Sequence, residues 1–205
     1  VGLTFSYHDG TAALRGIDLE IAAGEFALLL GPNGSGKTTL LHHLNRLLSP
    51  TAGQVFFKGR PLASLPEREV FSRIGLVFQD PNDQIFAATV AEDVAFGPRN
   101  LGLPPAMVEA RVARALKEVG IEGIRHKSVH YLSFGQKRRA AIAGVLAMEP
   151  EVLLLDEATA GLDPRGNEEL MELLARLNRS GLAVVMATHD VDLVMPYASR
   201  VFVLD

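Results

Sequence analysis

A glycine-rich segment near the start of the chain constrains the fold more than any other feature. Its residues are, in order, Gly31-Pro32-Asn33-Gly34-Ser35-Gly36-Lys37-Thr38-Thr39. The segment follows an apolar run at 26–30 and leads into a helix-like stretch at 39–48, which is the strand, loop and helix order of the P-loop pattern. Such a turn directs backbone N–H groups and the positive end of a helix dipole at a phosphate. The sequence therefore predicts a phosphate-binding loop in an α/β core.

Two side chains of this loop suit a triphosphate. Lys37 supplies a compact positive charge for β- and γ-phosphates, and the Thr38 hydroxyl is placed to ligate Mg²⁺, which prefers oxygen ligands. The alternative is a glycine turn with a chance lysine, and the strand and helix on either side argue against it. We expect these residues of the loop to bind the nucleotide: Gly31, Asn33, Gly34, Ser35, Gly36, Lys37, Thr38 and Thr39.

A second apolar run, at 152–155, ends in the acidic pair Asp156-Glu157. A carboxylate at the end of a buried strand is well placed to hold Mg²⁺ and its water shell, and its neighbour can orient water. An acidic pair can also be a solvated turn, but the four apolar residues before it and the P-loop upstream favour a site. We expect Asp156 to bind the metal.

Composition limits the remaining classes of function. The chain has 205 residues, of which 48% are hydrophobic, enough for one domain with a substantial core. Its net charge is −4 and it has no dense Lys/Arg block, so a large nucleic-acid surface is not expected. The absence of cysteine excludes disulfides, thiolate metal sites and a cysteine nucleophile. No apolar stretch approaches the roughly 20 residues of a membrane span.

The order of the apolar segments indicates an α/β fold in one domain, 1–205, with an inserted part. Continuous apolar strands that alternate with helices indicate a mostly parallel sheet, with catalytic groups at its carboxyl edge. We expect a P-loop core at 1–80 and 150–205 that includes an N-terminal antiparallel β part, and a helical subdomain at 85–148. Strands are expected at 3–7, 17–21, 26–30, 54–58, 74–78, 152–155, 183–187 and 201–204. Helices are expected at 39–48, 89–96, 104–119, 136–148 and 165–178.

Four further motifs narrow the interpretation. They are Gln79 after a strand, Leu132-Ser133-Phe134-Gly135-Gln136 at a helix start, Gly161-Leu162-Asp163, and Thr188-His189-Asp190 after a strand. With the P-loop and the acidic pair in this order, the chain resembles the ATP-binding subunits of ABC transporters over nearly its whole length. The segments 7–10, 78–86 and 132–139 look most like energy-coupling-factor ATPases, especially those of cobalt or nickel importers.

The resemblance implies roles for single residues. Glu157 is similar to the family's general base, and Gln79 would reach the metal or the lytic water. His189 would donate a hydrogen bond to the γ-phosphate. Tyr7 would stack on adenine, with Phe5 as the rival; the alternative for both is ordinary strand packing. A surface glutamine and a structural histidine are the corresponding alternatives for Gln79 and His189.

The segment Ser133, Phe134, Gly135 and Gln136 implies a dimer. A serine at a helix start offers a hydroxyl and backbone N–H groups to an anion, and in the family this anion site serves the nucleotide of a second, head-to-tail subunit. We expect Ser133, Gly135 and Gln136 to contact that nucleotide. Phe134 replaces the usual glycine of the motif, which puts in question the backbone conformation there. Asp163 would face the partner and couple the two sites, unless it is only an acid in a turn.

The resemblance also implies cofactors, partners and location. We expect ATP and Mg²⁺, a second ATP-binding subunit, a transmembrane coupling protein and a substrate-binding membrane protein, at the cytoplasmic face of the membrane. The expected solute is cobalt or nickel, and a vitamin is the alternative. A second class of function is a non-transport ABC ATPase acting on nucleic acid or ribosomes. Such proteins generally carry two ATP modules in one chain, a long coiled coil or a basic surface, and this sequence shows none of them. A simple P-loop kinase or GTPase would leave 132–136 without a purpose.

Overall fold

The computed structural model describes residues 1–205 and confirms the predicted α/β class. Its centre is a five-stranded parallel sheet with the strand order β6-β7-β8-β3-β9. The strands are β3 (Phe26–Leu30), β6 (Ile74–Val77), β7 (Val152–Asp156), β8 (Ala183–Thr188) and β9 (Arg200–Val203). All five coincide with predicted strands to within one residue at either end, because continuous apolar runs mark strands buried on both faces.

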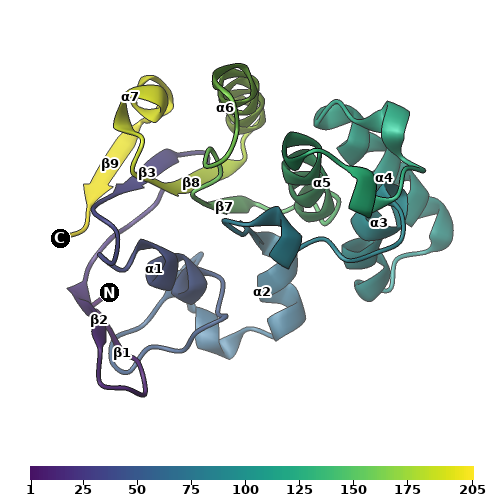
Figure 1. Ribbon diagram of the computed structural model, residues 1–205. Coiled ribbons are helices and arrows are strands. Elements are labelled where there is room, and N and C mark those ends of the chain that lie inside the picture. Colours follow the sequence, from purple (N-terminus) through teal and green to yellow (C-terminus); the bar gives the residue numbers. More distant parts are fainter.

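Helices cover both faces of the sheet (Figure 1). On one face lie α1 (Lys37–Leu44) and α2 (Glu67–Arg73); on the other lie α6 (Pro164–Arg179) and the short α7 (Val191–Val194). Adjacent residues of β3 point to opposite faces, since Leu28 belongs to the larger apolar cluster and Leu29 to the smaller one. Two cores therefore hold the sheet between helices and fix the carboxyl ends of its strands.

Three helices form a separate group beside β6 (Figure 1). They are α3 (Val90–Asn100), α4 (Pro105–Glu118) and α5 (Phe134–Leu146), and all lie within the segment 85–148. The predicted apolar face of α4 is buried at Val108, Val112, Ala115 and Leu116. The structure extends α3 to Asn100, past the predicted end at 96, and the buried Pro98 lies in its last turn. Gly97 in that turn lets α3 approach Met148.

The N-terminal antiparallel part is smaller than predicted. β1 (Leu3–Ser6) pairs with β2 (Ala12–Ile17), whereas a strand was expected at 17–21. The pairing ends at Leu3 and Ile17, so the apolar residues that follow have no ladder to join and pack as irregular backbone. β4 (Phe56–Phe57) and β5 (Arg60–Pro61) form only a short hairpin, since proline has no N–H to donate.

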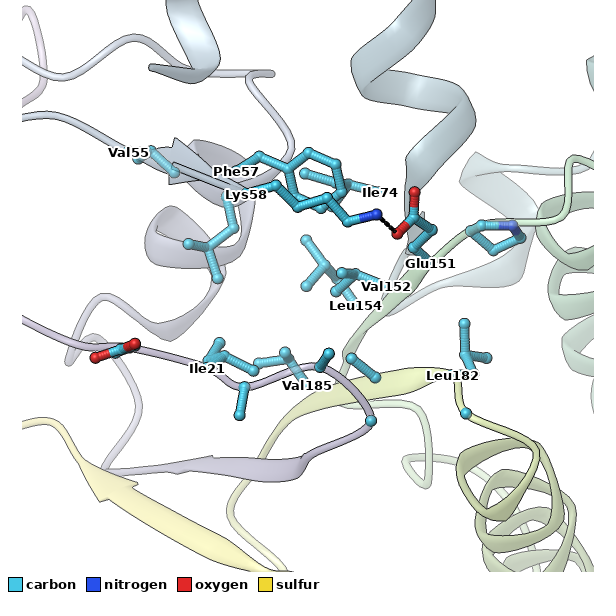
Figure 2. Close-up of a pocket in the computed structure, with 18 of the residues that line it drawn as sticks. Ile21, Val55, Phe57, Lys58, Ile74, Glu151, Val152, Leu154, Leu182 and Val185 are labelled. Atoms are coloured by element: carbon cyan, nitrogen blue, oxygen red, sulfur yellow. Dashed lines mark ion pairs between the residues drawn. The ribbon is translucent and has the colours of Figure 1, made fainter. Parts of the chain in front are cut away.

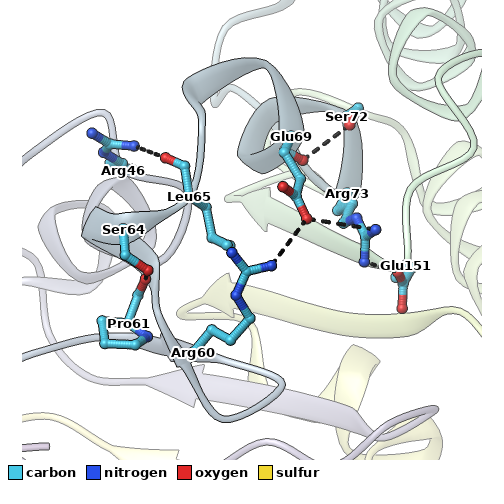
Figure 3. Close-up of polar contacts among 9 residues, drawn as sticks. All are labelled: Arg46, Arg60, Pro61, Ser64, Leu65, Glu69, Ser72, Arg73 and Glu151. Carbon is cyan, nitrogen blue, oxygen red and sulfur yellow. Dashed lines mark hydrogen bonds and ion pairs between the residues drawn. The ribbon is translucent and has the colours of Figure 1, made fainter.

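Charged side chains attach this hairpin to α2 and to the start of β7 (Figure 3). Glu69 lies 3.9 Å from Arg60 and 3.5 Å from Arg73, and Arg73 lies 3.2 Å from Glu151. No helix was predicted at α2, although Pro66 followed by Glu67 and Glu69 is a helix-start pattern. The pairs are largely exposed, so each contributes little stability alone; together they orient the hairpin.

None of the helices of the chain combines the length and apolar character needed to span a bilayer.

Candidate nucleotide site

The predicted phosphate loop lies between β3 and α1, at the carboxyl edge of the sheet. Gly36 precedes α1 with a φ of 93°, in the left-handed region that favours glycine. A Cβ at Gly36 would meet the carbonyl of Ala13 at 2.5 Å, and one at Gly31 would overlap the carbonyl of Leu204. Glycine is therefore required here by the neighbouring backbone, and the loop keeps its N–H groups free of covering side chains.

Lys37 is buried and points back over this loop. Its Nζ donates to the carbonyls of Gly31 at 2.8 Å and Pro32 at 3.0 Å, with only 6% of the residue exposed. The Ser35 hydroxyl is also buried and has no hydrogen-bond partner in the chain. A buried polar group without a partner is costly, so the loop carries donors that an anion would satisfy.

The loop meets the acidic strand end through one hydrogen bond. The Thr38 hydroxyl donates to Oδ2 of Asp156 at 2.7 Å, across 118 positions of sequence. Burial raises the pKa of Asp156, and the bond from Thr38 works in the opposite direction. Its Oδ1 is buried without a partner. Two of the predicted metal ligands, Thr38 and Asp156, thus lie together, with a carboxylate oxygen still free to bind a cation.

Glu157 has a strained backbone with a φ of 45°, unusual for a residue other than glycine. Its N–H donates to the carbonyl of Ala187 in β8 at 2.9 Å, which holds this conformation. Nδ1 of His189 lies 2.8 Å from Oε2 of Glu157; the Glu157 side chain is buried and the His189 side chain is exposed. The structure therefore brings Glu157 and His189 together although 32 positions separate them.

Tyr7 lies beside the first turn of α1, at the end of the loop. Its hydroxyl is 2.8 Å from the Thr39 hydroxyl, and its ring packs edge-on against Phe5 at 5.0 Å. The residue is 42% exposed. The same ring thus has a packed edge and an accessible surface, next to the phosphate loop.

Gln79 and Asp163 occupy the rim. Gln79 follows β6 and is exposed, and the sheet order places the end of β6 next to that of β7, which carries Asp156. Asp163 caps α6, where its Oδ1 accepts the N–H of Gly166 at 2.7 Å. Asp163 therefore has a helix-capping role within its own chain, which requires no partner subunit.

The segment 133–136 lies apart from the phosphate loop of its own chain. Ser133 is exposed and caps α5, exchanging hydrogen bonds with Gln136 in a capping box. The N–H groups of Phe134 and Gly135 donate no hydrogen bond within the chain. No hydrogen bond or ion pair joins this segment to residues 31–39. Its donors face outward, available to another molecule.

The unusual Phe134 is compatible with helix geometry, because α5 begins at this residue with Ser133 extended before it. Its ring packs on Gly161, where a Cβ would come within 2.9 Å of the ring.

Sequence reasoning missed one residue of this region, Arg138. Its side chain is buried and donates a hydrogen bond to the backbone carbonyl of Gln79. Nothing in the run of basic residues at 137–139 distinguishes the buried one.

A cleft of about 1290 Å³ does not coincide with this site. It opens at the amino ends of the strands, near Ile74, Val152 and Leu182, and Lys58 forms an ion pair with Glu151 across it (Figure 2). None of the predicted site residues lines it. Its lining is mostly apolar, so phosphate chemistry belongs to the opposite edge of the sheet.

A glycine loop and an acidic strand end on a parallel sheet define the class of P-loop nucleotide-hydrolysing proteins. Comparison with known proteins is more specific: a family described as "ABC transporter" matches residues 14–160. The energy-coupling factor transporter ATP-binding protein EcfA of Methanocaldococcus jannaschii is 56% identical over 98% of this chain and 73% of its own length. A protein with the same name from Methanothermobacter thermautotrophicus is 48% identical over 99% of this chain and 66% of its own length.

Solved structures give the same result. Clostridium perfringens cbiO1, described as part of the ABC transporter complex cbiONQ, has a TM-score of 0.91 and 47% identity, covering 100% of this chain and 82% of its own. The ATP-binding cassette MJ0796, dimeric and bound to ADP and Pi in a post-hydrolysis state, has a TM-score of 0.88 and 32% identity, covering 100% of this chain and 92% of its own. The chain belongs to the ABC transporter ATPases of the energy-coupling-factor type.

Proposed function

We propose that two ATP-binding chains of this type close around ATP and Mg²⁺, hydrolyse the ATP, and drive an importer of cobalt or nickel. The observation that carries the proposal is the hydrogen bond between Thr38 and Asp156, which joins the phosphate loop to the acidic strand end. It brings together the two halves of a site for a metal-bound triphosphate.

The chemistry of the donors fits Mg²⁺. Thr38 and Asp156 supply a hydroxyl and a carboxylate, the oxygen ligands that Mg²⁺ prefers, and Oδ1 of Asp156 has no other partner. Few protein ligands are needed, because Mg²⁺ usually keeps waters and binds substrate phosphates. When bound, the ion neutralises charge on the phosphates. Gln79, at the end of the neighbouring strand, is the third residue that we assign to the metal or the lytic water.

The protein groups divide the remaining work. Lys37, which holds two loop carbonyls in the free chain, exchanges them for phosphate oxygens and compensates their charge. Glu157 accepts a proton from the attacking water, as a general base within reach of the reacting atoms. His189, in contact with Glu157, donates to the γ-phosphate. Tyr7 offers its accessible surface to the adenine ring.

A second copy completes the site. The free N–H groups at the start of α5 form an anion site that faces outward, and MJ0796, a structural neighbour, is a dimer with ADP and Pi. We assign Ser133, Gly135 and Gln136 to the partner's nucleotide and Asp163 to the contact between subunits. ATP then stabilises the closed dimer by its additional contacts there.

The membrane partners that we propose are a transmembrane coupling protein and a substrate-binding protein, with this chain at the cytoplasmic face. The structural relative cbiO1 is part of a transporter complex, cbiONQ, which supports such an assembly. Cobalt or nickel is favoured by Phe134 and by the segment 78–86, which resemble the cobalt-type members. A vitamin is the second candidate, because several relatives carry the general name EcfA.

The variant Glu157→Gln tests the assignment of the base. It keeps the size and buried position of the side chain but cannot accept a proton, so kcat should fall by about 100-fold or more. ATP binding should persist, and sedimentation should show a dimer that accumulates with ATP and Mg²⁺. Normal turnover in a folded Glu157→Gln chain would rule out Glu157 as the base.

Transport tests the solute. Vesicles that contain the chain with the membrane proteins encoded beside it should accumulate Co²⁺ or Ni²⁺ when ATP is supplied on the side of this chain. The Glu157→Gln complex is the matched control and should show no uptake above background. ATP-dependent uptake of a vitamin without metal uptake would transfer the proposal to the second candidate.

A further inference from the structure

Arg138 is the most deeply buried charged residue of the chain, with 1% of its surface exposed. No carboxylate lies within ion-pair distance, and burial lowers the pKa of its guanidinium. Burying an unpaired charge is costly, and an apolar side chain of similar length would fill the same space at lower cost. The presence of arginine in α5 therefore calls for a reason beyond packing.

The guanidinium holds two consecutive carbonyl groups at the end of β6. Nη1 donates to the carbonyl of Phe78 at 2.7 Å, and Nη2 donates to that of Gln79 at 2.6 Å. Hydrogen bonds from a charged donor are about twice as strong as neutral ones. The backbone that carries the Gln79 side chain is therefore fixed by Arg138, while the side chain itself is exposed.

The same guanidinium contacts the start of α5. Its carbon lies 5.5 Å from the centre of the Phe134 ring, within cation–π range. The adjacent residue Lys137 donates to Oδ1 of Asn82 at 2.6 Å, which is a second, exposed link between α5 and the segment after β6. Arg138 thus joins the outward-facing anion site of the chain to the peptide of Gln79.

We propose that Arg138 is a positioning residue, which makes the start of α5 and Gln79 move as one unit when the dimer closes. Its effect passes through Gln79, so the inference rests on the role proposed above for that residue. Arg138 itself touches no nucleotide. When a partner's phosphates hold the N–H groups at Phe134 and Gly135, the guanidinium transmits that position to Gln79 in the site of its own chain.

The first test compares Arg138→Met and Arg138→Lys in the full chain. Met keeps the length of the side chain and removes both donors, so kcat should fall about 10- to 100-fold, as expected for a misplaced catalytic group. KM for ATP and the affinity of the monomer for a fluorescent ATP analogue should stay within about twofold, because the P-loop is untouched. Lys restores a charged donor and should recover part of kcat.

Arg46→Met is the matched control. Arg46 also donates to a backbone carbonyl, that of Leu65 at 2.5 Å, just before α2 (Figure 3). Its loss should lower the melting temperature and leave kcat unchanged. Circular dichroism establishes that each variant is folded. A folded Arg138→Met chain with normal kcat, or with a loss no larger than that of Arg46→Met, would overturn the inference.

A double-mutant cycle separates this inference from the role of Gln79 itself. If Arg138 acts through Gln79, adding Arg138→Met to Gln79→Ala should cost less than about threefold more, because the two losses share one cause. Losses that multiply would show that Arg138 acts elsewhere. If Gln79→Ala alone leaves kcat normal, the proposed role of Gln79 fails; a kcat loss in Arg138→Met would then contradict the positioning path as well.

Discussion

Asp156 shows how single residues are prepared for a ligand at a cost to the free chain. It is 4% exposed, one of its carboxylate oxygens is unpaired, and burial raises its pKa. Glu157 shares this character, because it is 7% exposed and its backbone lies in the left-handed region. Such local costs are concentrated where binding relieves them.

The pKa shift of Asp156 gives a test through pH. An acid whose pKa is raised on folding binds protons more readily in the folded state, so it lowers stability above its unfolded pKa, near 3.8. In Mg²⁺-free buffer, Asp156→Asn should therefore raise the melting temperature at neutral pH. This gain in melting temperature should vanish as the pH falls below about 4, where Asp156 is protonated in both the folded and the unfolded state.

Mg²⁺ provides the control for this prediction. Adding Mg²⁺ with ATP should stabilise the wild type by mass action and should stabilise Asp156→Asn much less. The variant Asp18→Asn, at an exposed position outside the site where the side chain accepts the N–H of Gly2, should follow the wild type in both conditions. A lower melting temperature for Asp156→Asn at neutral pH without Mg²⁺ would contradict the account.

At the scale of elements, the loop between β3 and α1 depends on glycines of two kinds. Gly34 and Gly36 both have positive φ, 83° and 93°. Only Gly36 also lies against backbone, because a Cβ there would come within 2.5 Å of the carbonyl of Ala13, whereas Gly34 faces open space. Gly34 is therefore needed only for its left-handed backbone conformation, whereas Gly36 is also needed for the close packing of α1 on β2.

These two glycines form a matched pair. Gly34→Ala should lower the free energy of unfolding by about 1–2 kcal/mol, the cost of left-handed backbone for an L residue. Gly36→Ala should cost clearly more, because a backbone carbonyl must also shift. Urea denaturation of both variants measures the difference. Equal losses would show that β2 does not constrain the loop.

The central sheet and the phosphate loop could both be predicted from the sequence. The sheet was predictable because buried parallel strands are continuous apolar runs, and the loop was predictable because its pattern needs a strand and a helix around it. The strand expected at 17–21 was wrong, since apolar residues packed as irregular backbone have the composition of a strand. Arg138 was missed because burial of one arginine among three basic residues depends on tertiary packing.

At the scale of the whole molecule, the proposed nucleotide site lies in two parts of the chain that no hydrogen bond or ion pair joins. The phosphate loop and Asp156 lie on one part, and the outward-facing start of α5 lies on another. A head-to-tail pair would join each loop to the partner's helix and form two equal sites, as twofold symmetry requires. Each proposed site is therefore composite, with one part from each chain.

Mixing two inactive variants tests this claim most directly. Lys37→Ala removes the positive charge that the loop offers to the phosphates, and Ser133→Glu places a negative charge at the start of α5. Each variant alone should therefore hydrolyse almost no ATP. Mixed dimers contain one site built from the intact loop of one chain and the intact helix of the other. Turnover of an equal mixture should rise to about a quarter of the wild-type value, because half of the dimers are mixed and half of their sites are intact. A mixture as inactive as its two components would contradict the account.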